Sequence, residues 1–182
     1  MMPAGPLMTE HRLIERMVQL MQSELRDVEV IGKVDVLFLD TAVDFLRTYA
    51  DRCHHGKEED ILFRDLAKKS LDPDHKKTMD ELLAEHVIAR ENVGALHDAR
   101  ISHSEGDPNA VGEVRRRLKA LTDLYPRHIE KEDRRFFIPC MAYFSREEMD
   151  AMLGEFFEFD RMMIHDKYKA IVSRTEKERK SG

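Results

Sequence analysis

Apolar residues recur at alternating three- and four-residue steps along most of the chain, and no segment shows a convincing period of two. On a helix this spacing gathers the apolar side chains into one stripe, so the pattern predicts an all-α fold. We expect helices over about residues 9–27 and 34–68, a third opening at Asp72-Pro73, a fourth opening at Asp107-Pro108, and a fifth over 145–174.

The starts of the last three helices carry specific sequence signals. Both Asp-Pro pairs place an N-cap before a proline at the first helical position, and Ser145 with Glu148 forms a capping box. Short links between the first four helices favour an up-down-up-down four-helix bundle. We therefore expect this bundle over residues 7–140, an additional C-terminal amphipathic helix over 145–174 packed on it, and a solvated charged tail at 175–182.

Polar residues interrupt the apolar stripes at six positions, which form a repeat of two histidines and one glutamate. The first copy is His11, His54 and Glu58, and the second is His86, His128 and Glu132, at offsets of 75, 74 and 74 residues. The flanking sequences agree as well, with TEH matching AEH and HHGKEEDILF matching HIEKEDRRFF. Two similar halves have been joined, which predicts approximate two-fold symmetry in the bundle.

These six residues are candidates for one metal site. In each His-x-x-x-Glu motif the imidazole and the carboxylate lie one helical turn apart, so they project together. A lone histidine on an apolar stripe is usually a hydrogen-bonded core residue, and a buried polar network without metal is the alternative here. Six such groups in one small core favour a metal, because each uncompensated buried charge costs on the order of several kcal/mol.

The donor count suits two ions. Four imidazoles divide into two per ion, while two carboxylates and a solvent oxide or hydroxide can bridge the ions, which leaves one open position on each. Carboxylate-bridged pairs inside helical bundles suit iron or manganese, whereas zinc prefers four-coordinate sites rich in nitrogen or sulfur. Iron is therefore the favoured metal.

In this order and with these flanks, the chain resembles the hemerythrin-like cation-binding family, known by its His-His-Glu signature. The resemblance covers about residues 7–140. It implies a four-helix bundle around a non-heme di-iron centre of two bridged iron ions, for which zinc or manganese could substitute. The implied metal ligands are His11, His54, Glu58, His86, His128 and Glu132. The same pattern of four histidines and two glutamates occurs in the iron–sulfur cluster repair di-iron proteins and in the iron-sensing domain of an F-box protein.

Two positions depart from the oxygen-carrying hemerythrins. The carriers have a His-x-x-x-His pair on the third helix, whereas Arg90 follows His86 here, so the fifth histidine is absent. The carriers also take their last carboxylate from an aspartate five residues after a histidine. Asp133 stands at that spacing, but Glu132 matches Glu58 across the repeat and is preferred.

The resemblance therefore implies a di-iron protein that senses or handles oxygen, nitric oxide, peroxide or iron at open coordination positions. One alternative is a di-iron protein for iron–sulfur cluster repair, although the cysteine-bearing segment usual in those proteins is not found here. A reversible oxygen carrier and a helical scaffold with a purely structural metal are the others.

The composition of the chain excludes some classes of binding partner. The 182 residues carry 30 basic and 36 acidic side chains, a formal net charge of −6, without a basic stripe, so nucleic acid is not an expected partner. No run approaches the roughly 18 apolar residues of a membrane span, and the N-terminus lacks a signal-peptide pattern, so we expect a cytoplasmic protein that binds no membrane. Cys53 and Cys140 suit buried thiols. The expected state is a monomer or a homodimer formed through the C-terminal helix.

Other polar residues near the motifs carry weaker signals. His55 and Glu59 form a second i, i+4 pair, but the repeat places Ile129 opposite His55, which favours a solvent-facing pair. Tyr125 is expected in the core rather than hydrogen-bonded at the site. Pro126 removes one helical amide, so we expect a kink there. The remaining histidines, expected at the surface, are His75, His97, His103 and His165.

Overall fold

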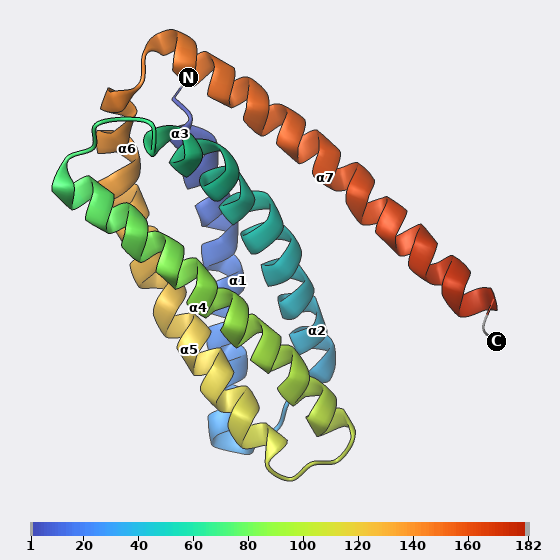
Figure 1. Ribbon diagram of the computed structural model, residues 1–182. Helices are drawn as coiled ribbons and strands as arrows, with labels where there is room; N and C mark the ends of the chain where they lie inside the picture. The colour runs from blue at the N-terminus through green and yellow to red at the C-terminus, as the bar shows by residue number, and fades with distance from the viewer. Residues whose placement is uncertain (1, 181–182) are drawn as a thin grey trace.

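The computed structural model describes the backbone of residues 2–180 and the side chains of residues 2–163. Over the described backbone the chain is helical with short links and contains no strand, which confirms the predicted all-α fold. The described elements form four long helical rods that pack side by side. A further helix, α7, starts at the end of the bundle that holds the N-terminus (Figure 1).

The first rod is the single helix α1 (Ala4–Ile31). The second rod comprises α2 (Val36–Phe45), two π-helical segments η1 (Leu46–His55) and η2 (Glu58–Phe63), and α3 (Arg64–Leu66). Gly32 ends α1 with φ of +72°, in the left-handed region that a residue with a Cβ rarely adopts. The side chain of Asp35 then caps α2 by accepting a hydrogen bond from the amide of Phe38 at 3.0 Å.

The third rod is α4 (Pro73–Ser104). The fourth comprises α5 (Ala110–Lys131), a π-helical segment η3 (Glu132–Phe136), α6 (Phe137–Cys140) and a 3₁₀ turn η4 (Met141–Tyr143). α5 packs against α1 and α4, while α4 also packs against α2 and η1, so each rod lies beside its neighbours in the chain. Pro126 lies inside α5, and the kink expected there stays a prediction.

Two of the three predicted helix caps are confirmed, and the third helix start lies later in the chain than predicted. Asp72 accepts the amide of Asp74 at 2.9 Å, and Ser145 and Glu148 cap each other's amides at 3.2 and 2.8 Å. Asp107 instead accepts the amide of Asn109 in a turn, and α5 begins after it at Ala110. The side chain thus closes a local turn that delays the helix.

The C-terminal helix α7 (Arg146–Lys180) begins at the capping box. Met152 and Phe156 are buried where α7 contacts η1 and η2, and Arg64 pairs with Glu155 at 3.0 Å. The helical backbone continues six residues past Arg174, where the sequence predicted its end. Side chains from residue 164 onward, including those of the predicted charged tail at 175–182, lie outside the described residues.

The interior is divided into two apolar clusters with a polar layer between them. The first apolar cluster includes Ile14, Val18, Met21, Ala50, Ala89, Leu96, Leu118 and Tyr125. The second apolar cluster includes Leu7, Ile61, Leu62, Leu82, Phe136 and Phe137, together with Met152 and Phe156 of α7. Every rod therefore passes from one cluster to the other through the positions that the sequence singled out.

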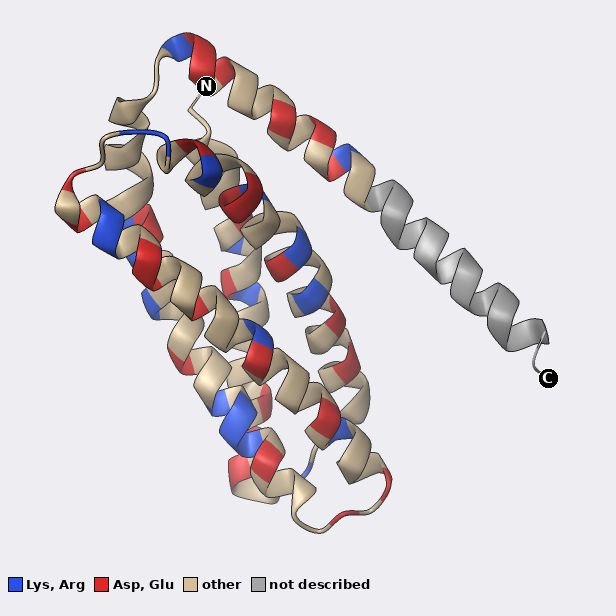
Figure 2. Cartoon of the chain, viewed as in Figure 1, with Lys and Arg blue, Asp and Glu red and all other residues tan. Residues whose placement is uncertain are grey.

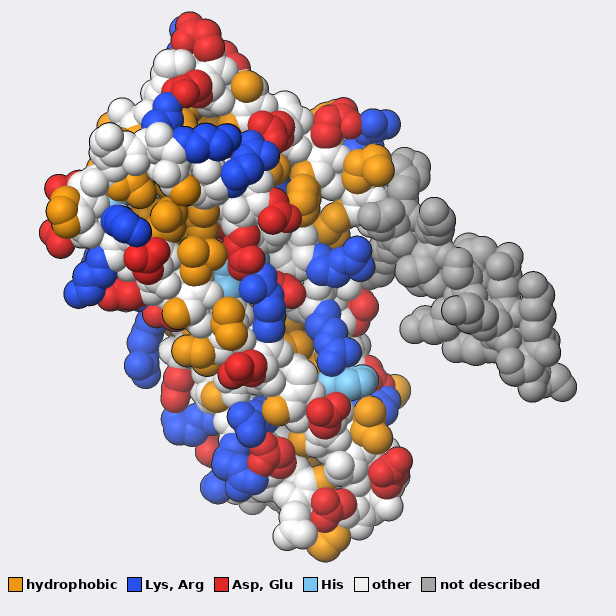
Figure 3. Space-filling model, viewed as in Figure 1, with side chains coloured by type: hydrophobic (Ala, Val, Ile, Leu, Met, Phe, Trp, Pro, Cys, Tyr) orange, Lys and Arg blue, Asp and Glu red, His pale blue; other side chains and the backbone are white. Residues whose placement is uncertain are grey.

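The surface carries charges of both signs. Acidic and basic residues are interspersed along the helices (Figure 2), and on the face in Figure 3 neither sign forms a continuous stripe. Within the described residues, no helix has a stretch apolar and long enough to span a bilayer.

Candidate metal centre

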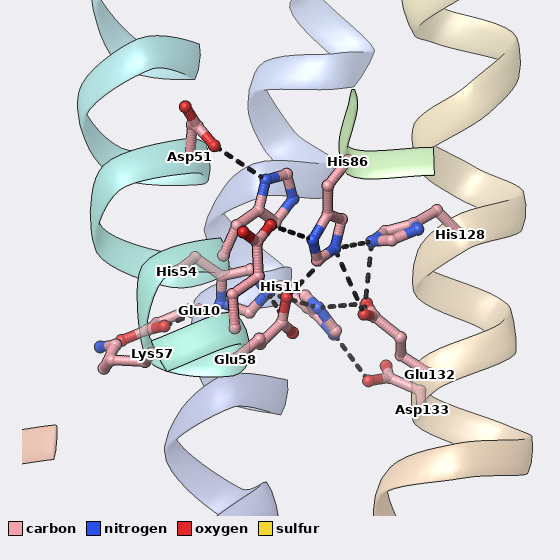
Figure 4. Close-up of polar contacts among 12 residues, drawn as sticks. Glu10, His11, Asp51, His54, Lys57, Glu58, His86, His128, Glu132 and Asp133 are labelled. Atoms are coloured by element: carbon pink, nitrogen blue, oxygen red, sulfur yellow. Dashed lines mark hydrogen bonds and ion pairs between the residues drawn. The ribbon is translucent and has the colours of Figure 1, made fainter. Parts of the chain in front are cut away.

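All six residues singled out by the repeat meet in the polar layer between the apolar clusters (Figure 4). Each is at most 2% exposed. They come from all four rods: His11 from α1, His54 from η1, Glu58 from η2, His86 from α4, His128 from α5 and Glu132 from η3. The structure thus brings the predicted ligands together, and their binding of a metal stays a prediction.

Each of the four histidines donates its Nδ1 proton to a carboxylate. The pairs are His11 with Asp133 at 2.7 Å, His54 with Glu10 at 2.8 Å, His86 with Glu59 at 2.6 Å and His128 with Glu85 at 2.8 Å. This contact fixes the ring orientation and leaves Nε2 as the free nitrogen, which is the usual arrangement of a metal-binding histidine. The four Nε2 atoms all lie at the centre.

The two histidine pairs form two neighbouring subsites. The Nε2 atoms of His11 and His54 are 2.8 Å apart, and those of His86 and His128 are 3.2 Å apart. We call the region beside His11 and His54 the first subsite, and the region beside His86 and His128 the second subsite.

The two glutamates lie between the subsites. Glu58 has Oε1 at 3.1 Å from Nε2 of His54 and Oε2 at 3.4 Å from Nε2 of His86. Glu132 has Oε2 at 3.1 Å from Nε2 of His11 and Oε1 at 3.3 Å from Nε2 of His128. Each carboxylate therefore presents one oxygen to each subsite, which is the placement that a bridging carboxylate requires.

The oxygens of these glutamates are buried without hydrogen-bond partners. Within the described residues, both oxygens of Glu58 and both of Glu132 are inaccessible and accept no hydrogen bond. Unpartnered buried carboxylates are strongly disfavoured. A cation at each subsite would give all four oxygens a partner, so the donor set fits a pair of metal ions.

The pKa values within the cluster show that its carboxylates favour nearby positive charge. Burial acts to raise the pKa of Glu58, but the imidazoles of His54, His86 and His11 overcome it and hold that pKa well below its ordinary value. Burial likewise acts to lower the pKa of His54, but the charge of Glu58 and the hydrogen bond to Glu10 raise it. The Glu58 carboxylate and the His54 imidazole therefore each favour the charged form of the other.

Four cations neutralise the outer carboxylates. Lys57 contacts Glu10, Lys131 lies 2.7 Å from Glu85, Arg12 contacts Asp133, and Arg90 lies 2.7 Å from Glu59. Asp133, a second candidate for the last carboxylate ligand, thus holds His11 from outside the centre.

The repeat could have revealed some of these outer carboxylates and cations, because Glu10 matches Glu85 and Lys57 matches Lys131 in the aligned motifs.

The expectation that His55 and Glu59 face solvent was wrong. His55 is 2% exposed, and its ring stacks on that of His86 with centroids 3.8 Å apart. Glu59 holds Nδ1 of His86. The physical reason is the π-helical backbone of η1, whose i→i+5 hydrogen bonds turn the chain less per residue than an α-helix does. Two consecutive histidines, His54 and His55, can then both face inward.

The other singled-out residues lie away from the centre. Tyr125 is buried in the first apolar cluster, as expected. Cys140 is a buried thiol, as expected, and burial raises its pKa to about 12, whereas Cys53 is half-buried and donates to Asp160. His75, His97 and His103 are partly exposed, and the side chain of His165 lies outside the described residues.

These features define a class of protein: a helical bundle whose core brings together paired histidines and glutamates that are potential metal ligands. The chain matches the family model of the hemerythrin HHE cation binding domain over residues 3–138. It therefore belongs to the hemerythrin HHE family, as the sequence resemblance implied. Comparisons with curated proteins and with solved structures gave no match.

Proposed function

We propose that this protein holds a non-heme di-iron centre and reacts through it with a small oxidant such as oxygen, nitric oxide or peroxide. The observation that carries the proposal is the pair of buried glutamates, each directing one unpartnered oxygen at each histidine pair. Two histidines and two bridging carboxylates per ion leave room in the coordination shell of iron. When bound, the iron pair would supply one- and two-electron redox chemistry.

In this proposal the chain's own residues hold and shield the centre. His11 and His54 would bind one ion through Nε2, His86 and His128 would bind the other, and Glu58 and Glu132 would bridge. The carboxylates on Nδ1 keep each ring in the tautomer that binds metal. The two apolar clusters exclude bulk water from both ends. Arg90 occupies the position of the carriers' fifth histidine and pairs with Asp51 and Glu59 instead.

The first experiment is metal analysis combined with an aerobic optical spectrum of freshly purified protein. Oxidised, bridged iron pairs absorb in the near ultraviolet, whereas zinc has a filled d shell and is colourless. We expect iron and this absorption together. Stoichiometric zinc without absorption would contradict the proposal.

The second experiment separates irreversible reaction from oxygen carriage. The reduced protein is mixed with oxygen in a stopped-flow instrument and then placed under vacuum. We expect conversion to a stable oxidised spectrum, because α4 carries Arg90 at the position where the oxygen carriers have a metal-binding histidine. Recovery of the reduced spectrum under vacuum would instead support reversible oxygen carriage.

A further inference from the structure

Two residues beside the centre, His55 and Asp51, have no counterpart of the same chemistry in the other half. At the repeat offset of 74 these correspond to Ile129 and Tyr125. Nδ1 of His55 lies 3.4 Å from Oδ1 of Asp51, a longer version of the contact that each of the other four histidines makes with a carboxylate. An imidazole and its Nδ1 partner are thus both present in one half and both absent from the other.

His55 lies against the second subsite. One potential ligand atom from each of His55, Glu58, His86 and His128 can be chosen so that all four lie within 4.8 Å of one another. All four residues are buried. This spacing is compatible with four donors around one ion, and no corresponding side chain of the other half reaches the first subsite, where Ile129 is apolar.

The His55 ring borders a cavity into which it can move. The ring is now nearly parallel to that of His86, with 13° between the planes. Two parallel rings cannot both contain one ion in their planes, so His55 must turn out of the stack to coordinate it. A cavity of about 280 Å³, lined by His55 with Leu46, Val93 and Tyr125 among others, provides the room.

We propose that His55 is a third imidazole ligand of the second subsite. This inference rests on the proposed function, because it requires an ion in each subsite. With Nδ1 directed at Asp51, the neutral ring presents Nε2, the same nitrogen that the other four histidines direct into the centre. The second subsite then has one more protein donor than the first, so the two irons are inequivalent and the first keeps more room for an exogenous ligand.

Mössbauer spectroscopy of the protein loaded with iron-57 tests this assignment. The variant His55→Ile copies the residue that the other half carries, and its fold is checked by circular dichroism. In the Mössbauer spectrum of His55→Ile, we expect the absorption of half the iron to shift while that of the other half stays unchanged. In competition with a chelator, the affinity of this variant for one of the two ions should fall at least tenfold. The matched control is Ile129→Val, which should shift neither.

Two results would overturn the assignment. If His55→Ile leaves both iron signals and both affinities unchanged, His55 only stacks on His86. A second measurement needs no variant: pulsed electron paramagnetic resonance of the mixed-valence protein with nitrogen-15 histidines counts the bound imidazoles. Five support the assignment and four overturn it. Failure of the unmutated protein to bind an iron pair would instead overturn the proposed function and this inference with it.

Discussion

Replacing Lys57 with methionine should destabilise the protein much more than replacing Lys131, although the two lysines are repeat partners. Lys57 is fully buried, contacts Glu10, and places its Nζ 2.7 Å from Asp160 of α7. The side chain of Lys131 is 22% exposed and lies 2.7 Å from Glu85. Methionine retains most of the apolar stem, so the comparison isolates the charge.

The magnitude follows from the difference in burial. Removing one partner of a buried ion pair costs about 3–5 kcal/mol, because the other charge is left uncompensated. Asp160 is 46% exposed and can be rehydrated, so we expect Lys57→Met to cost about 3 kcal/mol, the lower limit. Lys131→Met should cost about 1 kcal/mol or less, as for exposed pairs. At about 2–4 °C per kcal/mol, the Lys57 variant should melt roughly 6–12 °C lower.

The assay is urea unfolding followed by circular dichroism, performed on metal-free protein so that loss of metal does not contribute. The reasoning fails if the two variants lose equal stability. It also fails if Lys57→Met unfolds like the unmutated protein, because Glu10 and Asp160 would then not depend on the buried cation.

Three further predictions concern the centre. Glu10→Gln and Glu85→Gln should each lower metal affinity by about 10–100-fold in chelator competition, because these carboxylates orient His54 and His128; an unchanged affinity would contradict this role. Removing the metal should lower the melting temperature but retain most helical dichroism, since both apolar clusters persist; equal stability of the two forms would be inconsistent with a buried metal site. The metal-free protein should be most stable between pH 4.5 and 6.5. Glu58 has a lowered pKa in the folded protein, so its contribution to stability is lost as the pH falls below 4.5. His54 has a raised pKa, so its contribution is lost as the pH rises above 6.5. Urea denaturation midpoints that keep rising above pH 6.5 would refute this predicted pH dependence.

The helices and the six central residues could be predicted because both depend on local pattern. The apolar stripes follow the helical period, and the polar interruptions repeat at nearly constant offsets. Asp72 and the pair Ser145 and Glu148 cap helices through contacts within a few residues. Such short-range interactions are readable from the chain alone.

The π-helical turns and the burial of His55 could not be predicted in this way. A shift from i→i+4 to i→i+5 hydrogen bonds changes which side chains face inward, and the apolar period carries no signal for it. The burial of Lys57 depends on α7, which lies far away in sequence. Phe159 of α7 sits so close to Gly56 that an added Cβ would lie 2.6 Å from its ring. Only the tertiary structure reveals that contact.

Iron stoichiometry after anaerobic reconstitution tests the central claim most directly. The unmutated protein should retain two irons per chain after removal of excess metal. His54→Ala and His128→Ala, which alter equivalent positions of the two subsites, should each lose iron. A single iron per chain, or complete loss in one variant with full retention in the other, would contradict a centre to which both halves contribute.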